Sequence, residues 1–215
     1  MRGPGTAQRA DDEEKLHVAL RGLRGLVGGS GSVNTRLSDI AHLATQAIPC
    51  VDGVSVASFH VVDGMLQVQG WQISAPFIRD VDILQYVTLN QGPCIACTTA
   101  RRPIVSRSLT SDVRWQRLAA KVTGLGVESA LSLPLLTDDR LIGSINCYNH
   151  HRDAFGHHEV QLGMTFAHPA AMTLDNARPE RVAHQRTEQL KQSLRRGSAI
   201  DQAIGIIRGR TGASP

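Results

Sequence analysis

The chain's architecture is set by the segment Glu128-Ser-Ala-Leu-Ser-Leu-Pro-Leu-Leu-Thr-Asp-Asp-Arg-Leu-Ile-Gly-Ser-Ile-Asn-Cys-Tyr-Asn149. Two apolar runs, 128–136 and 141–149, flank the polar residues 137–140, and this pattern predicts a β-hairpin. A second hairpin is predicted over 54–62 and 65–73, around the turn residues Asp63-Gly64. Strands that come in hairpins, with helices between and around them, favour an antiparallel α+β domain.

Helical spacing of apolar residues predicts the elements that surround these strands. Pro49 ends the first helix, and Gly92-Pro93 has the composition of a helix start. Pro103-Ile104-Val105 reads as an extended segment. The predicted helices cover 37–48, 82–87, 93–102 and 115–125, with a long helix that starts near Gly156.

The N-terminal residues 1–32 are interpreted as a flexible arm with a short helix. Apolar residues recur weakly between Leu16 and Val27, but Gly22 and Gly25 interrupt them, and the run Gly28-Gly-Ser-Gly-Ser32 follows. A dimer-forming helix and a fraying end are both compatible with this pattern, and the fraying end is favoured. The other predicted boundaries place one compact domain at 33–178, and a linker helix with an incomplete C-terminal module at 179–215.

Composition and charge restrict the functional classes. The chain has 215 residues and four cysteines. It shows neither the apolar core of a signal peptide near its start nor a run of about 20 apolar residues that would span a membrane. We therefore expect a cytoplasmic protein with reduced thiols.

Positive charge gathers at the C-terminal end. From Arg178 onward there are eight basic residues and three acidic ones, whereas the preceding part has 15 and 16. Such a segment can be a solvated helical face or a surface that faces nucleic acid. It has no aromatic residue, so contacts with RNA would be mainly to phosphates and loop edges.

The last residues carry a family resemblance. Apolar residues recur at helical spacing from Ile200 to Ile207, and Gly209-Arg-Thr-Gly212 follows. The segment 200–215 resembles the opening of an ANTAR module, the three-helix RNA-binding domain of antitermination regulators, and we expect it to be incomplete. The resemblance implies RNA hairpins in nascent transcripts as partners of the complete module. The candidate RNA-binding residues are Arg195, Arg196, Gln202, Arg208 and Arg210.

A second resemblance covers about two thirds of the chain. It rests on Gly92-Pro93-Cys94, Arg102-Pro103, Trp115, Ala130 to Leu135, Ile142 to Tyr148 and Asp175-Asn176-Ala177. Residues 37–177 resemble a GAF domain of the kind fused to ANTAR in actinobacterial regulators. This resemblance implies a central antiparallel sheet with helices on one face and a loop-covered pocket on the other, a possible small-molecule ligand, and dimerisation through terminal helices. Candidate pocket residues are Trp71, Tyr86, Cys94, Trp115 and Tyr148.

Two prolines depart from the family pattern. Pro169 and Pro179 stand where the C-terminal helix of related proteins continues, and a proline within a helix removes a hydrogen bond or introduces a kink. Transmission of a signal along one rigid helix is therefore not expected.

Catalytic chemistry is sparse in this sequence. Cys94 and Cys97 near a helix start could supply a reactive thiolate, although small buried hydrophobes are the favoured interpretation. The pairs His150-His151 and His157-His158 are interpreted as surface loop residues rather than metal ligands. We expect no catalytic residue and no metal site, and the sequence does not identify a cofactor. The favoured function is a signal-sensing homodimeric regulator of transcription antitermination; the alternatives are a dimerisation module without RNA activity and a thiol-dependent reductase.

Overall fold

The computed structural model describes residues 5–27, 32–62, 65–138 and 140–176. Its centre is a five-stranded antiparallel sheet with the strand order β2-β1-β5-β4-β3. The strands are β1 (Gly53–Val62), β2 (Met65–Ile73), β3 (Ile104–Ser106), β4 (Ser129–Thr137) and β5 (Arg140–Asn149). Both predicted hairpins are confirmed as the pairs β1–β2 and β4–β5, and the predicted α+β class holds for the described residues.

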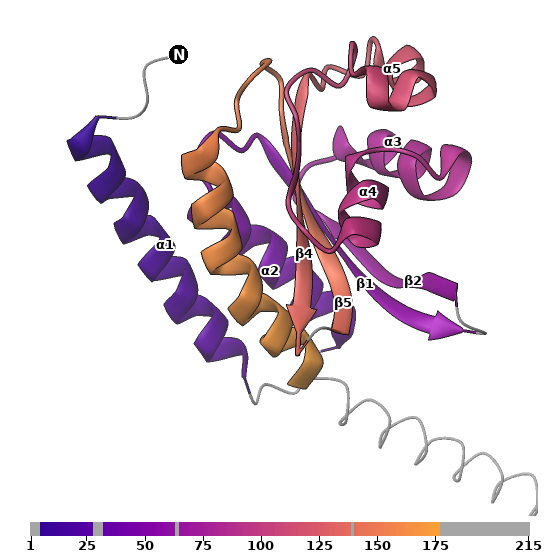
Figure 1. Cartoon of the computed structure of the whole chain (residues 1–215). Helices are drawn as coiled ribbons and strands as arrows, with labels where there is room; N and C mark the ends of the chain where they lie inside the picture. The colour runs from indigo at the N-terminus through magenta and orange to yellow at the C-terminus, as the bar shows by residue number, and fades with distance from the viewer. Residues whose placement is uncertain (1–4, 28–31, 63–64, 139, 177–215) are drawn as a thin grey trace, which may run out of the picture. The chain divides into compact units, whose positions relative to one another are not determined.

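The sheet is covered by helices on both faces (Figure 1). Successive side chains of a strand point to opposite faces, so Leu131, Leu133 and Leu135 of β4 enter one core, and Ala130 enters the other. Consequently β4 and β5 are buried along almost their whole length. Continuous apolar runs in the sequence therefore correspond to strands buried on both sides.

The first face carries α1 (Thr6–Leu26), α2 (Val33–Ala47) and a helix over residues 157–176. Figure 1 shows these three helices on the same side of the sheet. Ser32 caps α2, since its Oγ accepts a hydrogen bond from the Thr35 amide at 3.1 Å. Leu37, Ile40 and Ala44 of α2 then pack into the core beneath the sheet.

The interpretation of the N-terminal segment as a fraying end is wrong. Helix α1 has 21 residues, and its buried residues Leu16, Ala19 and Leu23 belong to the same core as α2 and the sheet. Gly22, which weakened the sequence pattern, permits this packing. A Cβ at position 22 would lie 2.6 Å from Leu43 Cδ2, so the absent side chain lets the two helices approach closely.

The second face carries shorter helices in place of the expected loop cover. These are α3 (Ile78–Ile83), the π-helix η1 (Leu84–Leu89), α4 (Pro93–Ala100), the 3-10 turn η2 (Val113–Trp115) and α5 (Gln116–Val122). The predicted helix over 82–87 thus starts earlier and changes to π-helical geometry. The predicted helix over 115–125 starts as a 3-10 turn and ends at Val122.

Pro169 does not end the C-terminal helix of the domain. The helix over 157–176 runs through His168 and Pro169 without a break. Its buried residues Phe166, Ala167 and Ala170 flank the proline and pack in the first core, so tertiary packing outweighs the lost hydrogen bond. Pro179, the predicted helix near Ile200 and all five candidate RNA-binding residues lie outside the described residues.

No helix within the described ranges is long and apolar enough to cross a membrane. The chain divides into two units, Met1–Asp175 and Asn176–Pro215. The first unit contains the sheet, both cores and every site discussed below.

Candidate ligand site

A row of polar side chains crosses the second face of the sheet. Ser55 of β1 and Ser132 of β4 are the cross-strand neighbours of Asn146 on β5. All three are fully buried, and Ser144 lies two residues further along β5. Asn146 Nδ2 donates to Ser55 Oγ at 3.1 Å. The sheet thus presents a polar floor where an apolar core would be usual.

Two oxygen atoms of this floor are not satisfied by the described part of the chain. Asn146 Oδ1 and Ser132 Oγ are buried and have no hydrogen-bond partner there. A buried polar atom without a partner costs about 1–3 kcal/mol, so native proteins rarely keep one without a reason. The floor therefore has hydrogen-bonding capacity that its own residues leave unused.

Tyr86 on η1 lies directly above the floor. Its hydroxyl group hydrogen-bonds to Ser144 Oγ at 2.9 Å and accepts a hydrogen bond from Asn146 Nδ2 at 2.9 Å. Short π-helical segments are rare and occur frequently at functional sites. Here the π-helix places a hydroxyl group on the polar floor of the sheet.

Asp82 at the end of α3 is the centre of a second set of hydrogen bonds. Trp71 Nε1 donates to Asp82 Oδ2 at 2.7 Å, and the Tyr148 hydroxyl group donates to Asp82 Oδ1. Gln85 Nε2 donates in turn to the Tyr148 hydroxyl oxygen at 2.9 Å. Through these contacts, side chains from α3, η1, β2 and β5 meet around the Asp82 carboxylate.

Gln85 also connects this set to α4. The Cys94 amide donates to Gln85 Oε1 at 3.2 Å. The preceding Gly92 has a φ of 139°, and a Cβ there would lie 2.3 Å from Gln85 Oε1. Glycine is required at position 92 because both the backbone conformation and the close approach of Gln85 exclude a side chain.

Burial controls the ionisation of these groups. It raises the pKa of Asp82 to about 6, against the opposing hydrogen bonds of Ser55, Tyr148 and Trp71. Burial likewise raises the pKa of the Tyr86 and Tyr148 hydroxyl groups well above the usual value. Near neutral pH the site therefore combines a largely ionised carboxylate with neutral phenols.

Burial also determines the pKa values of the cysteine thiols at this site. Cys94 and Cys97 are fully buried, and loss of solvation raises the pKa of Cys97 to about 12 and that of Cys94 well above the usual value. Both thiols are therefore protonated at neutral pH. This state disfavours thiolate chemistry, because the thiolate is the nucleophile.

A hollow opens beside Asp82, between β2 and the α3–η1 segment. It has a volume of about 90 Å³ and is lined by Val68, Trp71, Asp82, Ile83, Tyr86 and Val87. Val68, Ile83 and Val87 are exposed to solvent, Val87 to 78%. The Arg79 guanidinium group lies 5.7 Å from the centre of the Trp71 ring.

Of the five predicted pocket residues, Trp71 and Tyr86 line the hollow, and Tyr148 and Cys94 belong to the same hydrogen-bond network without lining it. Trp71, Tyr86 and Tyr148 take part directly, and the backbone of Cys94 joins them through Gln85. Trp115 packs in the second core instead, below Arg114 at 4.2 Å, and does not line the hollow. It forms part of the structure that supports the site.

The sequence analysis did not identify the polar residues of the site. Those residues are Ser55, Asp82, Gln85, Ser144 and Asn146. A usable signal existed for some of them: Asp82 lies between the apolar residues Val81 and Ile83, and Asn146 lies between Ile145 and Cys147 in a predicted strand. A polar residue at a predicted core position is a candidate for function.

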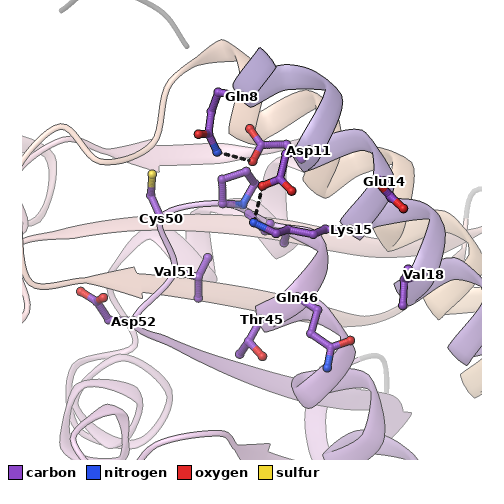
Figure 2. A pocket seen from close by; sticks show the side chains of 13 residues that line it. Gln8, Asp11, Glu14, Lys15, Val18, Thr45, Gln46, Cys50, Val51 and Asp52 are labelled. Carbon is purple, nitrogen blue, oxygen red and sulfur yellow. Dashed lines mark hydrogen bonds and ion pairs between the residues drawn. The ribbon is translucent and has the colours of Figure 1, made fainter. Parts of the chain in front are cut away.

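A larger groove lies on the first face, between α1 and the connection from α2 to β1. Figure 2 shows the side chains that line it, among them Asp11, Lys15, Cys50 and Asp52. Its volume is about 670 Å³, and Lys15 Nζ contacts Asp11 Oδ2 at 2.6 Å. By volume alone, this groove would be the stronger candidate for a ligand site. Its exposed polar side chains face solvent or pair with each other, and its buried Asp12 is already bound by Gln8 and His158. We therefore assign the ligand site to the buried polar set on the other face.

Two of the predicted surface histidines have structural contacts: His150 packs against Phe77, with ring centroids 4.6 Å apart, and His158 pairs with a buried aspartate. His158 Nε2 lies 2.9 Å from Oδ2 of the buried Asp12, which also accepts a hydrogen bond from Gln8. This pair joins α1 to the start of the helix over 157–176. In the described ranges, no group of three or more histidine, cysteine, aspartate or glutamate side chains is arranged to hold a metal ion.

An antiparallel sheet of this order, covered by helices on both faces, defines an α+β domain of the GAF-like class. The chain belongs to the GAF domain family, whose model matches residues 34–175. GAF domains are common sensory and regulatory modules, and the match includes every polar residue of the candidate site. A search of curated proteins gave no match to this sequence.

Solved structures show the same fold at low sequence identity. A free methionine-R-sulfoxide reductase from Neisseria meningitidis, in complex with its substrate, is 13% identical with a TM-score of 0.58, covering 84% of this chain and 98% of the reductase chain. The GAF domain of an Acinetobacter phosphoenolpyruvate-protein phosphotransferase is 13% identical with a TM-score of 0.57, covering 82% and 97%. The corresponding domain from Coxiella burnetii is 15% identical with a TM-score of 0.56, covering 79% and 98%.

Proposed function

We propose that this chain is a sensory regulator, in which the GAF domain binds a small molecule at the polar site and the C-terminal segment acts on RNA. The observation that carries the first part is the buried floor, where Asn146 Oδ1 and Ser132 Oγ have no partner in the described structure. A ligand that supplies donors there removes the cost of leaving these atoms unpaired. The π-helix η1, which carries Tyr86 over the floor, is the element that would respond to the ligand.

The proposed output is transcription antitermination by binding RNA hairpins. It is supported by the excess of eight basic over three acidic residues from Arg178 onward and by the ANTAR-like segment at 200–212. Arg195, Arg196, Gln202, Arg208 and Arg210 are the proposed contacts. In this proposal the chain performs no catalytic step, and a homodimer joined through its terminal helices is the active form.

Native mass spectrometry of protein purified from its own host tests the sensing part. We expect a retained small molecule that is lost after Asn146→Leu substitution, since leucine removes the polar group at the centre of the floor. Val113→Leu, at an exposed position away from the site, is the matched control and should retain the molecule. A wild-type protein that retains nothing, and that gains no stability from any compound of a metabolite library, would contradict ligand sensing.

RNA binding is tested by fluorescence anisotropy with a two-hairpin RNA and a scrambled control. The 215-residue chain should bind both with similar affinity in the range of about 10⁻⁴–10⁻⁶ M, falling steeply with salt, because the basic segment attracts phosphates. A version extended to complete the three-helix module should prefer the hairpins by more than about tenfold, a difference of about 1.4 kcal/mol. Equal binding of both RNAs by the extended version would favour the alternative, a dimerisation module without RNA activity.

A further inference from the structure

Helix α1 has an outer face that the described structure leaves open. The buried residues of this helix lie together on the side that packs against the domain. The residues on the opposite side are exposed, and we call them the outer face of α1: Ala10, Glu14, His17, Val18, Arg21 and Gly25. Figure 2 shows Glu14 and Val18 on the same side of α1, at the edge of the groove on the first face. Val18 is apolar and yet 44% exposed. This face can therefore contact another chain.

Charge is divided along α1. Residues 6–15 hold four acidic and two basic side chains, whereas residues 16–26 hold two basic side chains, Arg21 and Arg24, and no acidic one. The helix dipole favours acidic residues near the start of a helix and basic residues near its end, but only within the terminal turns. This effect accounts for Arg24, which lies in the last turn, but for neither Glu14 nor Arg21.

Glu14 and Arg21 carry opposite charges on the outer face. Within the part of the chain that the structure describes, neither forms a hydrogen bond or an ion pair, whereas the neighbouring Asp11 pairs with Lys15 at 2.6 Å. They lie about two turns apart, with Val18 between them. A second α1 that runs in the opposite direction, with a two-fold axis beside Val18, brings each Glu14 to the partner's Arg21. A parallel second helix would bring like charges together, which repel each other.

Gly25 supports the same arrangement. Its φ is not left-handed, and no atom lies within 4 Å of the place where its Cβ would be. Neither backbone conformation nor packing within the described chain therefore requires a glycine there, in contrast to Gly22. A glycine within a helix is destabilising relative to alanine unless another group approaches the backbone closely. With the axis beside Val18, Gly25 lies opposite the partner's Ala10, and two small residues allow the helices to approach.

We propose that two copies of the chain pair through the outer face of α1, with the helices antiparallel and the two-fold axis beside Val18. Each Glu14 forms an ion pair with the partner's Arg21, and each Ala10 lies against the partner's Gly25. Charge pairs of this kind determine direction and register more than affinity. The assignment rests on the homodimer of the proposed function, since it names the face and the direction of that dimer.

Analytical ultracentrifugation of the full 215-residue chain tests the charge pairs. Glu14→Arg and Arg21→Glu each replace both attractive pairs of the dimer by repulsive ones, so each should raise the dimer dissociation constant at least about tenfold. The double variant exchanges the charges and restores attraction, and should return to within about threefold of the wild type. Asp80→Arg makes the same change of charge at an exposed position of α3, on the other face of the sheet, and should dissociate as the wild type does.

Disulfide cross-linking tests the direction of the helices. The background is Cys50→Ser, because Cys50 is an exposed cysteine. In the antiparallel dimer the two Ala10 residues are about 22 Å apart along the helix axis, from about 15 residues with a rise of 1.5 Å each. Ala10→Cys alone should therefore not cross-link, whereas a mixture of Ala10→Cys and Gly25→Cys chains should. Val18→Cys lies beside the axis and should cross-link with itself, which shows that the outer faces are in contact.

Self-cross-linking of Ala10→Cys, or a wild-type dissociation constant in both Glu14→Arg and Arg21→Glu, would overturn the antiparallel pairing and leave the homodimer in place. Weaker dimers of both single variants without recovery in the double variant would also contradict the pairing, because the two side chains would then not share one contact. A monomeric wild type would overturn the pairing together with the homodimer of the proposed function.

Discussion

At the scale of single residues, Asp82 is the point where hydrogen bonds from different elements of the site meet. Its carboxylate receives hydrogen bonds from β2 and β5, although the residue itself lies on α3. Burial raises its pKa to about 6, so the folded protein holds a proton more tightly than the unfolded chain does. An aspartate with a raised pKa has an unusual consequence, since its ionisation destabilises the fold.

Replacement of Asp82 by asparagine should therefore change how stability depends on pH. Between the unfolded value of 3.8 and the folded value of about 6, the native state binds more protons, so acidification stabilises the wild type at this group. From about pH 7.5 to about pH 4, the wild-type free energy of unfolding should rise by roughly 2 kcal/mol relative to that of Asp82→Asn. Urea denaturation across this range measures the difference. Asp80→Asn is the control, and a wild type that loses stability relative to Asp82→Asn on acidification would contradict the prediction.

The cysteines should differ sharply in their reaction with a thiol-labelling reagent. Cys94, Cys97 and Cys147 are fully buried, whereas Cys50 is exposed at the edge of the first-face groove (Figure 2). At neutral pH we expect Cys50 to be modified first and Cys94 to react only when the domain opens. Mass spectrometry of the labelled peptides gives the order, and Cys50→Ser should remove the fast phase. Modification of Cys94 ahead of Cys50 would show that its thiol is activated.

At the scale of elements, α1 and η1 show packing and hydrogen bonding overriding local preference. The two glycines of α1 weaken its helical pattern, yet the helix is complete because Leu16, Ala19 and Leu23 are buried against the rest of the domain. The segment after Ile83 adopts π-helical geometry, and its residues Gln85 and Tyr86 meet groups on β5. Neither feature can be obtained from helix propensities.

Truncation of Leu23 to alanine should therefore destabilise the whole domain. Leu23 is 1% exposed, and removal of a buried leucine side chain costs about 2–5 kcal/mol. Glu13→Ala, at an exposed position of the same helix, should change the free energy of unfolding by less than about 0.5 kcal/mol. Urea denaturation of both variants measures this. If Leu23→Ala unfolds like the wild type, α1 does not belong to the cooperative unit.

At the scale of the whole molecule, the helices at the two ends of the domain retain apolar residues on their surface. Val18 and Val27 belong to α1 and its C-cap, and Met172 lies on the helix over 157–176. Each is more than 40% exposed. In the proposed homodimer, a second copy of the chain covers these residues.

Sedimentation at high micromolar protein concentration should give a dimer. The double variant Val18→Glu with Met172→Glu should shift the equilibrium to the monomer, because it places charges on the apolar residues that the partner would cover. Val113→Glu, at an exposed position near η2, is the control and should stay dimeric. A monomeric wild type under these conditions would exclude the homodimer.

Much of the fold was available in the sequence because its signals are local. The runs at 128–136 and 141–149 predicted β4 and β5, and Gly92-Pro93 predicted the start of α4 within one residue. The periodicity of apolar residues, the turn residues and the helix starts can each be recognised from residues that are close together in the sequence. Trp71, Tyr86 and Tyr148 were chosen for their size, and large side chains are frequently part of a pocket wall.

The polar arrangement of the site was decided by the tertiary structure. Tyr148 meets Asp82 across a separation of 66 residues, and Asn146 meets Ser55 across 91. Sequence patterns of burial cannot distinguish Trp115, which packs in the core, from Trp71, which borders a hollow, since both are large aromatic residues followed by a glutamine. The sequence by itself determined the strands, their pairing in hairpins and the family, through interactions between near neighbours. Only the packing of α3, η1 and α4 on the sheet decided which polar groups meet, because hydrogen bonds between distant residues depend on the three-dimensional placement of every element between them.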